Sequence, residues 1–320
     1  MNAIETHDLT RDFGTLRALD GLTVDVPPGL VVGFLGPNGS GKTTTIRLLL
    51  GLIRPTHGSA TVLGFDMAKH AAAVRERCGA LLEHTGLYER LSAEDNLEYY
   101  GRIARMTERD RKARIRELLT EAELWERRHE AVGQWSRGMK QKLAVARALL
   151  HRPSLVFLDE PTAGLDPVAA AALRHNLATQ VRRDGVTVFL TTHNLAEAEK
   201  LCGRVAVIRK GKLLAVGHPD ELRRQAHANA HPVATFVGRN LDGQATSLLS
   251  GQPGVVSVTS RGSELDVELD GHTDLAPLVA LLVSNGAAIE EIRRPKATLE
   301  DLFLDLVDDQ PADQGAPALN

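Results

Sequence analysis

A glycine-rich stretch at residues 36–44, GPNGSGKTT, has the residue types needed to hold a nucleotide triphosphate. It follows the apolar run LVVGFL and precedes the helix-like segment TTTIRLLLGL. Glycines let backbone N–H groups curl around phosphates, Lys42 can reach the β- and γ-phosphate oxygens, and Thr43 can place its hydroxyl on Mg²⁺. The N-terminus of the following helix directs a positive dipole end at the same anion. The candidate nucleotide ligands are Gly36, Pro37, Asn38, Gly39, Ser40, Gly41, Lys42, Thr43 and Thr44.

A second segment, SLVFLDEP at residues 154–161, is typical of a buried strand that ends in two carboxylates. Ligands of open α/β sheets bind at the carboxyl ends of the strands. Asp159 is therefore suited to a Mg²⁺ contact, and Glu160 could take a proton from an attacking water. Alone, the pair would be read as a strand-ending turn. Beside a phosphate-binding loop, the two are candidate metal and catalytic residues.

Residues 135–150, WSRGMKQKLAVARALL, begin a helical pattern, and PTAGLDP and TTH follow at 161–167 and 191–193. The order of glycine-rich loop, WSRGM, LVFLDEP, PTAGLDP and TTH resembles the nucleotide-binding subunits of ATP-binding cassette (ABC) transporters. The resemblance covers about residues 4–225. Five motifs in one order are far more specific than any one of them.

The resemblance implies roles for several further residues, with ATP and Mg²⁺ as the ligands. WSRGM stands in the place of the family's LSGGQ signature, so Ser136 and Gly138 would be offered to the γ-phosphate of ATP held by the other subunit of a homodimer. Asp166 stands in the D-loop, and His193 stands where the family has its switch histidine. Without this context, a lone histidine after a strand is more simply structural.

The signature segment departs from the family pattern at three positions, Trp135, Arg137 and Met139. Ser136 and Gly138 remain, and they carry the hydroxyl and the close-approaching N–H that the contact needs. For Arg137 two interpretations stay open: it adds positive charge near the phosphate, or it faces solvent.

Two more positions have an expected role and an ordinary alternative. Glu83 occupies the Q-loop position, where a carboxylate can accept a Mg²⁺ or water contact but adds negative charge near a triphosphate. The alternative is a solvated loop glutamate. Phe13 stands where the family stacks an aromatic ring on adenine, which would give affinity more than selectivity. The alternative is a core residue.

Composition limits the classes of protein that fit. The chain has 320 residues, 43% of them hydrophobic, with a net charge of −3 and a pI near 6.5, so it shows no basic footprint for nucleic acid. Cys78 and Cys202 lack metal-site spacing, and with no sign of secretion they suggest a reducing cytosol. No apolar run reaches the roughly 18 residues of a membrane span, and the first residues are no signal peptide. Taken with the resemblance to ABC transporter subunits, this implies a peripheral protein on the cytoplasmic face of a bacterial membrane.

The strand and helix patterns predict an α/β fold: a P-loop core sheet with an antiparallel edge subdomain and a helical insertion, plus a small C-terminal α+β domain. The cassette would span residues 1–225, with the charged helical insertion at about 85–135. Residues 226–232 read as a linker, and 233–307 as a βαββαβ ferredoxin-like domain closed by a helix capped at Thr298. Residues 308–320 read as a disordered tail.

The C-terminal segment, ending in TLEDLFLDL, resembles the extension of bacterial daunorubicin-type drug-export ATPases. The resemblance implies an ATPase subunit that energises efflux of a drug-like, antibiotic or lipid-like molecule through a separate membrane permease. Near Glu83 it places the groove for the permease's cytoplasmic helix, with Tyr88 as an anchor, unless Tyr88 packs inside the cassette.

Two other classes of function fit the sequence less well than transport does. A soluble cassette protein of translation or DNA repair usually needs two cassettes or a very long coiled-coil insert, and this chain has one glycine-rich loop of this kind and neither of those features. A P-loop small-molecule kinase would need a lid over the phosphate acceptor and leaves WSRGM unexplained.

Overall fold

The computed structural model describes residues 1–229, 233–270, 273–293, 299–300 and 303. The chain divides into two compact units, Met1–Pro219 and Asp220–Asn320. The predicted boundary at residue 225 differs from this division, because residues 219–229 form one helix, α8 (Pro219–Asn229). The first part of the expected linker is therefore helical. Thr298 and the predicted tail, 308–320, lie outside the described residues.

A six-stranded sheet forms the centre of the first unit, in the order β10-β9-β3-β8-β7-β6. All neighbours pair in parallel except β10 with β9. The strands β3, β7 and β8 are buried along their whole length, as expected for parallel strands covered on both faces. The bounds are β3 (Val31–Leu35), β6 (Cys78–Leu81), β7 (Leu155–Asp159), β8 (Thr187–Thr192), β9 (Arg204–Arg209) and β10 (Lys212–Gly217).

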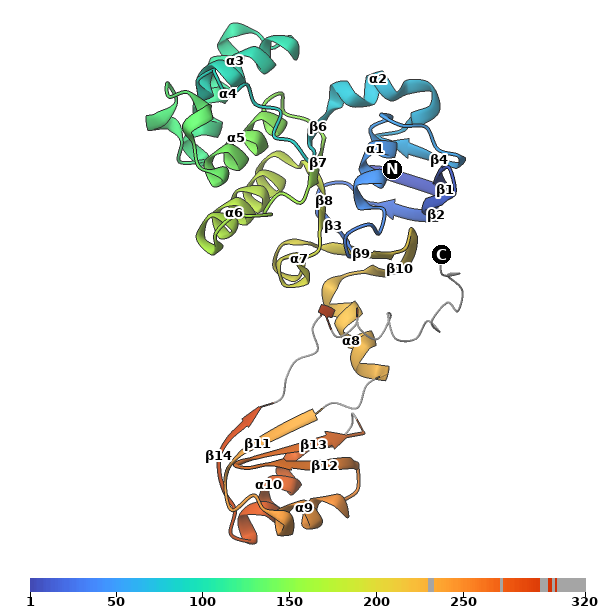
Figure 1. The fold of residues 1–320 in the computed structure, drawn as a ribbon, viewed down its shortest axis with the longest axis vertical. Helices are drawn as coiled ribbons and strands as arrows, with labels where there is room; N and C mark the ends of the chain where they lie inside the picture. Colours follow the sequence, from blue (N-terminus) through green and yellow to red (C-terminus); the bar gives the residue numbers. More distant parts are fainter. Residues whose placement is uncertain (230–232, 271–272, 294–298, 301–302, 304–320) are drawn as a thin grey trace, which may run out of the picture. The chain divides into compact units, whose positions relative to one another are not determined.

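An antiparallel sheet and a group of helices flank this core on opposite sides (Figure 1). The antiparallel sheet has the order β2-β1-β4-β5, and it is the predicted edge subdomain. The helical insertion consists of α3, α4 and two short 3₁₀ turns, also as predicted. The elements are β1 (Ile4–Phe13), β2 (Leu16–Val26), β4 (His57–Val62), β5 (Phe65–Asp66), α2 (Met67–Arg77), α3 (Ala93–Ile103) and α4 (Glu108–Glu121).

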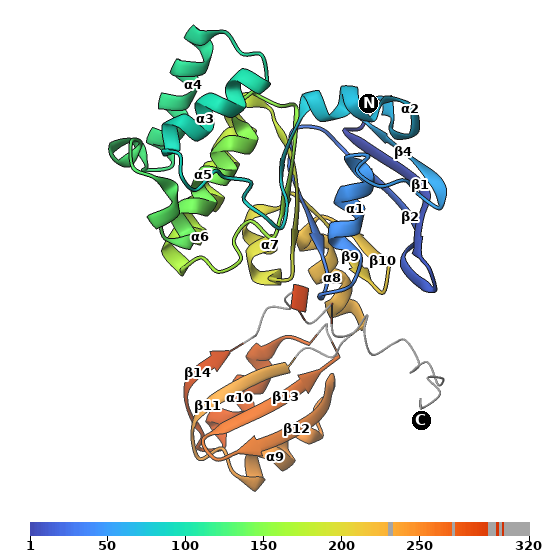
Figure 2. The same ribbon diagram turned by 45° about the horizontal axis from the view of Figure 1, so that its top comes forward.

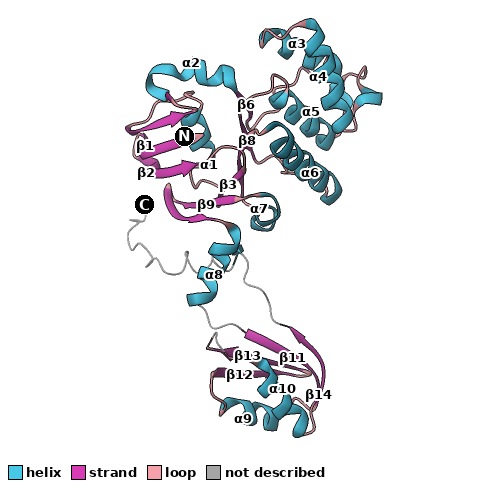
Figure 3. Ribbon diagram, turned by 180° about the vertical axis from the view of Figure 1, so that it is seen from behind, coloured by secondary structure: helices cyan, strands magenta, loops and turns pink. Residues whose placement is uncertain are grey.

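Four helices adjoin the central sheet. Three of them, α1, α6 and α7, follow the strands β3, β7 and β8, and α5 precedes β7. Figure 3 shows α1 on one side of the central sheet and α5 and α6 on the other. Side-chain caps start three of these helices: Ser136 caps α5, Asp166 caps α6 and Asn194 caps α7. Their bounds are α1 (Lys42–Leu49), α5 (Arg137–Leu149), α6 (Pro167–Asp184) and α7 (Leu195–Leu201).

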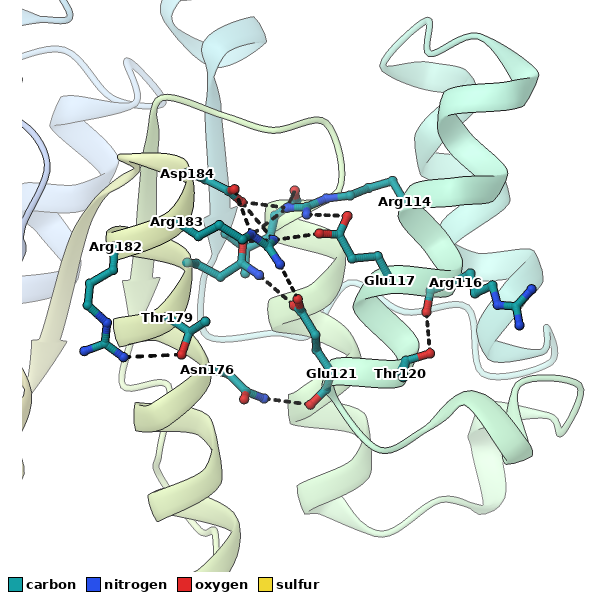
Figure 4. Close-up of polar contacts among 12 residues, drawn as sticks. Arg114, Arg116, Glu117, Thr120, Glu121, Asn176, Thr179, Arg182, Arg183 and Asp184 are labelled. Carbon is teal, nitrogen blue, oxygen red and sulfur yellow. Dashed lines mark hydrogen bonds and ion pairs between the residues drawn. The ribbon is translucent and has the colours of Figure 1, made fainter.

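A buried arginine joins the helical insertion to α6 (Figure 4). Arg114 of α4 is 2% exposed and donates to the carbonyl of Leu149 and to Gln180 of α6. Its guanidinium lies 2.8 Å from Glu117 and 3.8 Å from Asp184. We call Arg114, Glu117, Gln180 and Asp184 the α4–α6 junction.

The second unit is a four-stranded antiparallel sheet in the order β12-β13-β11-β14. Residues on β11 and β13 alternate between buried and partly exposed, and both helices cover the same face (Figure 2). This is the predicted βαββαβ ferredoxin-like arrangement. Its elements are β11 (Val233–Arg239), α9 (Gly243–Ser250), β12 (Val255–Arg261), β13 (Glu264–Leu269), α10 (Leu275–Ser284) and β14 (Ala288–Arg293).

Two sequence observations can be followed into the structure. Cys78 and Cys202 are both buried and free, and burial raises the pKa of each thiol to about 12. Over the described part of the chain, no helix is long and apolar enough to cross a lipid bilayer.

Candidate nucleotide site

The glycine-rich loop runs from β3 into α1, as its sequence pattern predicts. A Cβ on Gly36 would lie 2.3 Å from the carbonyl oxygen of Ile208, so only glycine fits there. Gly41 has φ of +106° and would place a Cβ 2.5 Å from the carbonyl of Ala18. The loop can therefore pack tightly while the free N–H groups of the first turn of α1 point outward.

Lys42 is 6% exposed and has its partners within the site. Its ammonium donates to the carbonyls of Gly36 and Pro37, at 2.7 and 3.1 Å. It also lies 3.4 Å from the carboxylate of Glu160. An arriving phosphate must therefore replace these contacts before Lys42 can bind it.

Thr43 and Asp159, the two residues with an expected metal role besides Glu83, are in direct contact. The hydroxyl of Thr43 donates to Asp159 Oδ2 at 2.7 Å. The other carboxylate oxygen, Oδ1, accepts from the hydroxyl of Thr191 at 2.5 Å. Thr191 is fully buried, and it was not predicted from the sequence as a site residue. The feature that could have pointed to it is a hydroxyl near the end of a buried strand. The pairing of β8 with β7 places Thr191 beside Asp159.

Glu160 lies between Lys42 and His193. Its Oε2 is 2.8 Å from His193 Nδ1, and its N–H donates to the backbone carbonyl and the hydroxyl of Thr191. Glu160 has φ of +49°, a conformation that non-glycine residues rarely adopt. The backbone of the strand end thus holds the carboxylate in an unusual position, as is common at functional sites.

Most of the loop residues and both strand-end carboxylates line one cavity of about 740 Å³, whereas His193 and Thr191 are not among its lining residues. Lys42, Thr43, Thr44, Asn38, Gly39 and Gly41 border it together with Asp159 and Glu160. The ring of Phe13 is 43% exposed, borders the cavity and carries the guanidinium of Arg11 at 4.5 Å. Phe13 is therefore a surface ring rather than a core residue. Arg17 and Lys210 border the same cavity and were not predicted.

Glu83 also borders the cavity, and Arg47 of α1 lies 3.1 Å from its carboxylate. Both side chains are about half exposed. The negative charge expected to oppose a triphosphate is thus paired with Arg47, a cation on α1 that does not itself border the cavity. His193 is 59% exposed and remains open to solvent on its free ring side.

The signature residues lie outside the cavity of their own chain. Ser136 is exposed and accepts the N–H of Met139, and Gly138 is partly exposed. Asp166 is exposed and caps α6; the N–H of Ala169, ahead of that of Val168, lowers the pKa of its carboxyl. Arg137 does border the cavity, and its guanidinium packs against Gly164.

The chemistry of the site fits ATP and Mg²⁺. The hydroxyl of Ser40 is buried and has no hydrogen-bond partner, and a bound phosphate would supply one. Thr43 and Asp159 present a hydroxyl and a carboxylate side by side, which are ligands that Mg²⁺ accepts. Within the described residues, no group of three or more His, Cys, Asp or Glu side chains could hold a metal alone.

Comparison with known proteins points to the same family by a family model and by individual relatives. The family described as ABC transporter matches residues 19–163. The daunorubicin resistance ATP-binding protein DrrA3 of Streptomyces coeruleorubidus is 37% identical, with 96% of each chain covered. The bacitracin transport ATP-binding protein BcrA of Bacillus licheniformis is 34% identical, with 95% of this chain and 97% of that protein covered.

Solved structures agree with the sequence relatives. An ATP-binding subunit of an ABC transporter superposes with a TM-score of 0.64 at 33% identity, covering 70% of this chain and 92% of that one. A dimeric ATP-binding cassette in a post-hydrolysis state, bound to ADP and Pi, gives 0.62 at 25% identity, covering 67% and 98%. With the cavity built from the family's own motifs, these matches show that the chain belongs to the ABC transporter ATP-binding proteins.

Proposed function

We propose that this chain hydrolyses ATP to drive an export-type ABC transporter, moving a drug-like, antibiotic or lipid-like molecule through a separate membrane permease. The observation that carries the proposal is Glu160, held between Lys42 and His193 at the phosphate-binding loop. The relatives named for daunorubicin resistance and bacitracin transport support the substrate class. Those relatives give no support to a role in translation or DNA repair.

ATP would bind with its phosphates over the glycine-rich loop and its adenine toward Phe13. The free N–H groups at the start of α1 and the ammonium of Lys42 would then bind the phosphate oxygens. Thr43 and Asp159 would hold Mg²⁺, which neutralises phosphate charge when bound. Thr191 occupies Oδ1 of Asp159, so Oδ2, which accepts from Thr43 in this structure, is the oxygen that would face the metal.

Glu160 would accept a proton from the attacking water. His193 would orient the carboxylate of Glu160. The 2.8 Å contact uses Nδ1 of His193, which leaves Nε2 available for the γ-phosphate. The exposed ring of His193 and the partly exposed carboxylate of Glu160 can both be reached by substrate. Such proton transfer contributes about 10²- to 10⁴-fold to a rate.

Two chains would close around two ATP molecules as a homodimer. Ser136 and Gly138 lie outside their own cavity and are accessible, so they are free to meet a nucleotide held by a second copy. Asp166, in the loop before α6, would lie in the same interface. The dimeric state of a cassette bound to ADP and Pi supports this arrangement by similarity.

The permease would dock beside α3, placing the chain on the cytoplasmic face of the membrane. Tyr88 is 46% exposed and packs with Tyr99 and Tyr100, at ring-centre distances of 5.0 and 6.2 Å. A cavity of about 590 Å³ lies next to this group and is bordered by Tyr100, Ile103 and Arg147. An aromatic rim beside an open cavity fits a short amphipathic helix.

The second unit would be an accessory domain, with the cassette independent of it. Its sequence has no GxxxxGK(S/T) pattern, and the core of its described part is closed by apolar side chains. A chain ending at Gln225 is expected to stay soluble and to gain thermal stability from ATP, while dimerising less tightly. Aggregation of that shortened chain would place the boundary elsewhere.

The function is tested by Glu160→Gln. Turnover should fall by about 10²- to 10⁴-fold while ATP binding persists, and sedimentation should show a dimer only with ATP. Thr23, a hydroxyl residue on β2 remote from the cavity lining, supplies the matched control as Thr23→Val. Hydrolysis at the wild-type rate by Glu160→Gln would refute the assignment.

A further inference from the structure

A carboxylate behind the site joins three elements of the first unit. Glu197 of α7 accepts a hydrogen bond from the hydroxyl of Thr162, in the loop between β7 and α6. Its other oxygen lies 2.8 Å from the guanidinium of Arg174 of α6. We call Thr162, Glu197 and Arg174 the clamp.

The clamp is packed against apolar side chains and has little access to water. The side chains of Glu197 and Arg174 are 18% and 20% exposed. A small cavity of about 10 Å³ lies beside the pair and is also bordered by Leu177, Leu190 and Leu201. This volume is at the lower limit for holding one water molecule, so little solvent can enter beside the pair. Charge-assisted hydrogen bonds are strongest in such surroundings.

The two ends of the clamp lie next to the two groups of the proposed chemistry. Thr162 follows Glu160 by two residues, and Glu197 follows His193 by four. The N–H of Glu197 also donates to the side chain of Asn194, the residue after His193. Movement of α7 away from the Thr162 loop would therefore pull His193 away from Glu160.

We propose that Glu197 is a positioning residue that keeps His193 in contact with Glu160 by tying α7 to the loop that follows β7. The inference rests on the proposed function, in which Glu160 and His193 act together on ATP. Glu197 itself borders the small cavity behind these loops and not the nucleotide cavity, so it touches neither ATP nor the metal.

The first measurement is steady-state ATP hydrolysis and ATP binding by the full-length chain. Displacing a reacting group by about 1 Å can cost on the order of 10²-fold in rate, so Glu197→Ala should lower kcat by about 10- to 100-fold. The Kd for ATP should stay within about twofold, because the phosphate-binding residues are untouched. Glu126→Ala, at an exposed glutamate of the helical insertion, is the matched control and should change neither value.

The conservative variant provides a rescue. The amide of Glu197→Gln can accept from Arg174 and donate to the hydroxyl of Thr162, so most of kcat should return. Thr162→Val removes one contact without changing the shape of the side chain. It should lower kcat by about 3- to 10-fold, and it serves as the second test if Glu197→Ala does not fold.

A double-mutant cycle separates positioning from general destabilisation. If Glu197 acts through His193, Glu197→Ala should have no further effect on kcat in a His193→Ala background. An equal loss in both backgrounds would overturn the proposal, as would a folded Glu197→Ala or Thr162→Val chain with unchanged kcat. A wild-type chain that binds ATP without hydrolysing it would instead sink the proposed function.

Discussion

The two units of this protein differ in where they keep polar side chains. Among the residues that the structure describes, every buried polar or charged side chain belongs to Met1–Pro219, including Lys42, Arg114, Asp159 and Thr191. The core of the second unit is apolar throughout its described part, with Phe236, Leu265, Val267 and Leu269 at its centre. Its charges pair on the surface, as Arg293 does with Glu264.

The difference indicates how each unit can be changed without losing its fold. A buried polar group stabilises a structure only while its partners stay in place, so each one makes its surroundings sensitive to movement. The first unit has such groups at the nucleotide cavity and at the α4–α6 junction. The second unit has no such groups among its described residues, and its sheet and helices pack through apolar side chains. Four predictions test this contrast.

The largest effect is expected in the apolar core. Phe236 is fully buried, so Phe236→Ala should cost about 3 to 5 kcal/mol, which is most of the stability of a small domain. Limited proteolysis should then cut the second unit while the cassette still binds ATP. Val256→Ala, at a half-exposed residue of the same sheet, is the control. Loss of ATP binding together with the second unit would contradict the separation of the two units.

A smaller loss is expected at the α4–α6 junction. Arg114→Met would leave Glu117 and Asp184 without their buried partner, although Arg183 still pairs with both. Breaking a buried ion pair costs about 3 to 5 kcal/mol, and we expect the lower end of that range here. Urea unfolding would measure it, with exposed Arg109→Met as the control. An unchanged midpoint would mean that the junction adds no stability.

A third effect concerns the helical insertion as a docking surface. Burying an aromatic anchor can contribute about 2 kcal/mol, so Tyr88→Ala should weaken association with the permease by about thirtyfold. The ATPase of the isolated chain should barely change, because Tyr88 does not border the nucleotide cavity. Recovery of the complex and Tm are measured together. Early melting with loss of ATPase would show that Tyr88 is a core residue instead.

The smallest effect depends on pH. The Arg183 guanidinium, opposed by burial, lowers the pKa of Asp184 below its ordinary 3.8. The charged form is thus favoured in the folded state, so its stabilisation is complete above about pH 5 and is lost as pH falls through the folded pKa. Asp184→Asn should cost about 1 kcal/mol at pH 6 and progressively less toward pH 3. Exposed Asp25→Asn should show no such trend, and a pH-independent cost would rule the pairing out.

Local motifs of the site could be predicted from the sequence, but contacts between distant strands could not. The loop at 36–44 and the carboxylates after β7 are recognisable because neighbouring residues define them. The contact of Thr191 with Asp159 depends on which strands pair, and the clamp depends on how α6 and α7 pack. Neither arrangement follows from spacing along the chain.

Two further features were not predicted from the sequence: the helix that includes residues 226–229, and the partner of Glu83. Residues 226–232 look like a linker because of Asn229 and Pro232, yet Pro219, Asp220 and Glu221 form a good helix start that extends through Asn229. The charge of Glu83 looked unfavourable on its own. Arg47 lies one turn into α1, and only the folded loop brings the two together.

The contacts of Lys42 have a consequence for which anions the loop accepts. A free phosphate would have to draw the ammonium away from two carbonyls and a carboxylate, and it could offer only one small charged group in return. ATP would bring three phosphates and an adenine ring, and Phe13 borders the same cavity. We therefore expect inorganic phosphate to bind this loop more weakly than ATP, because one small anion replaces the contacts of Lys42 without adding contacts elsewhere in the cavity.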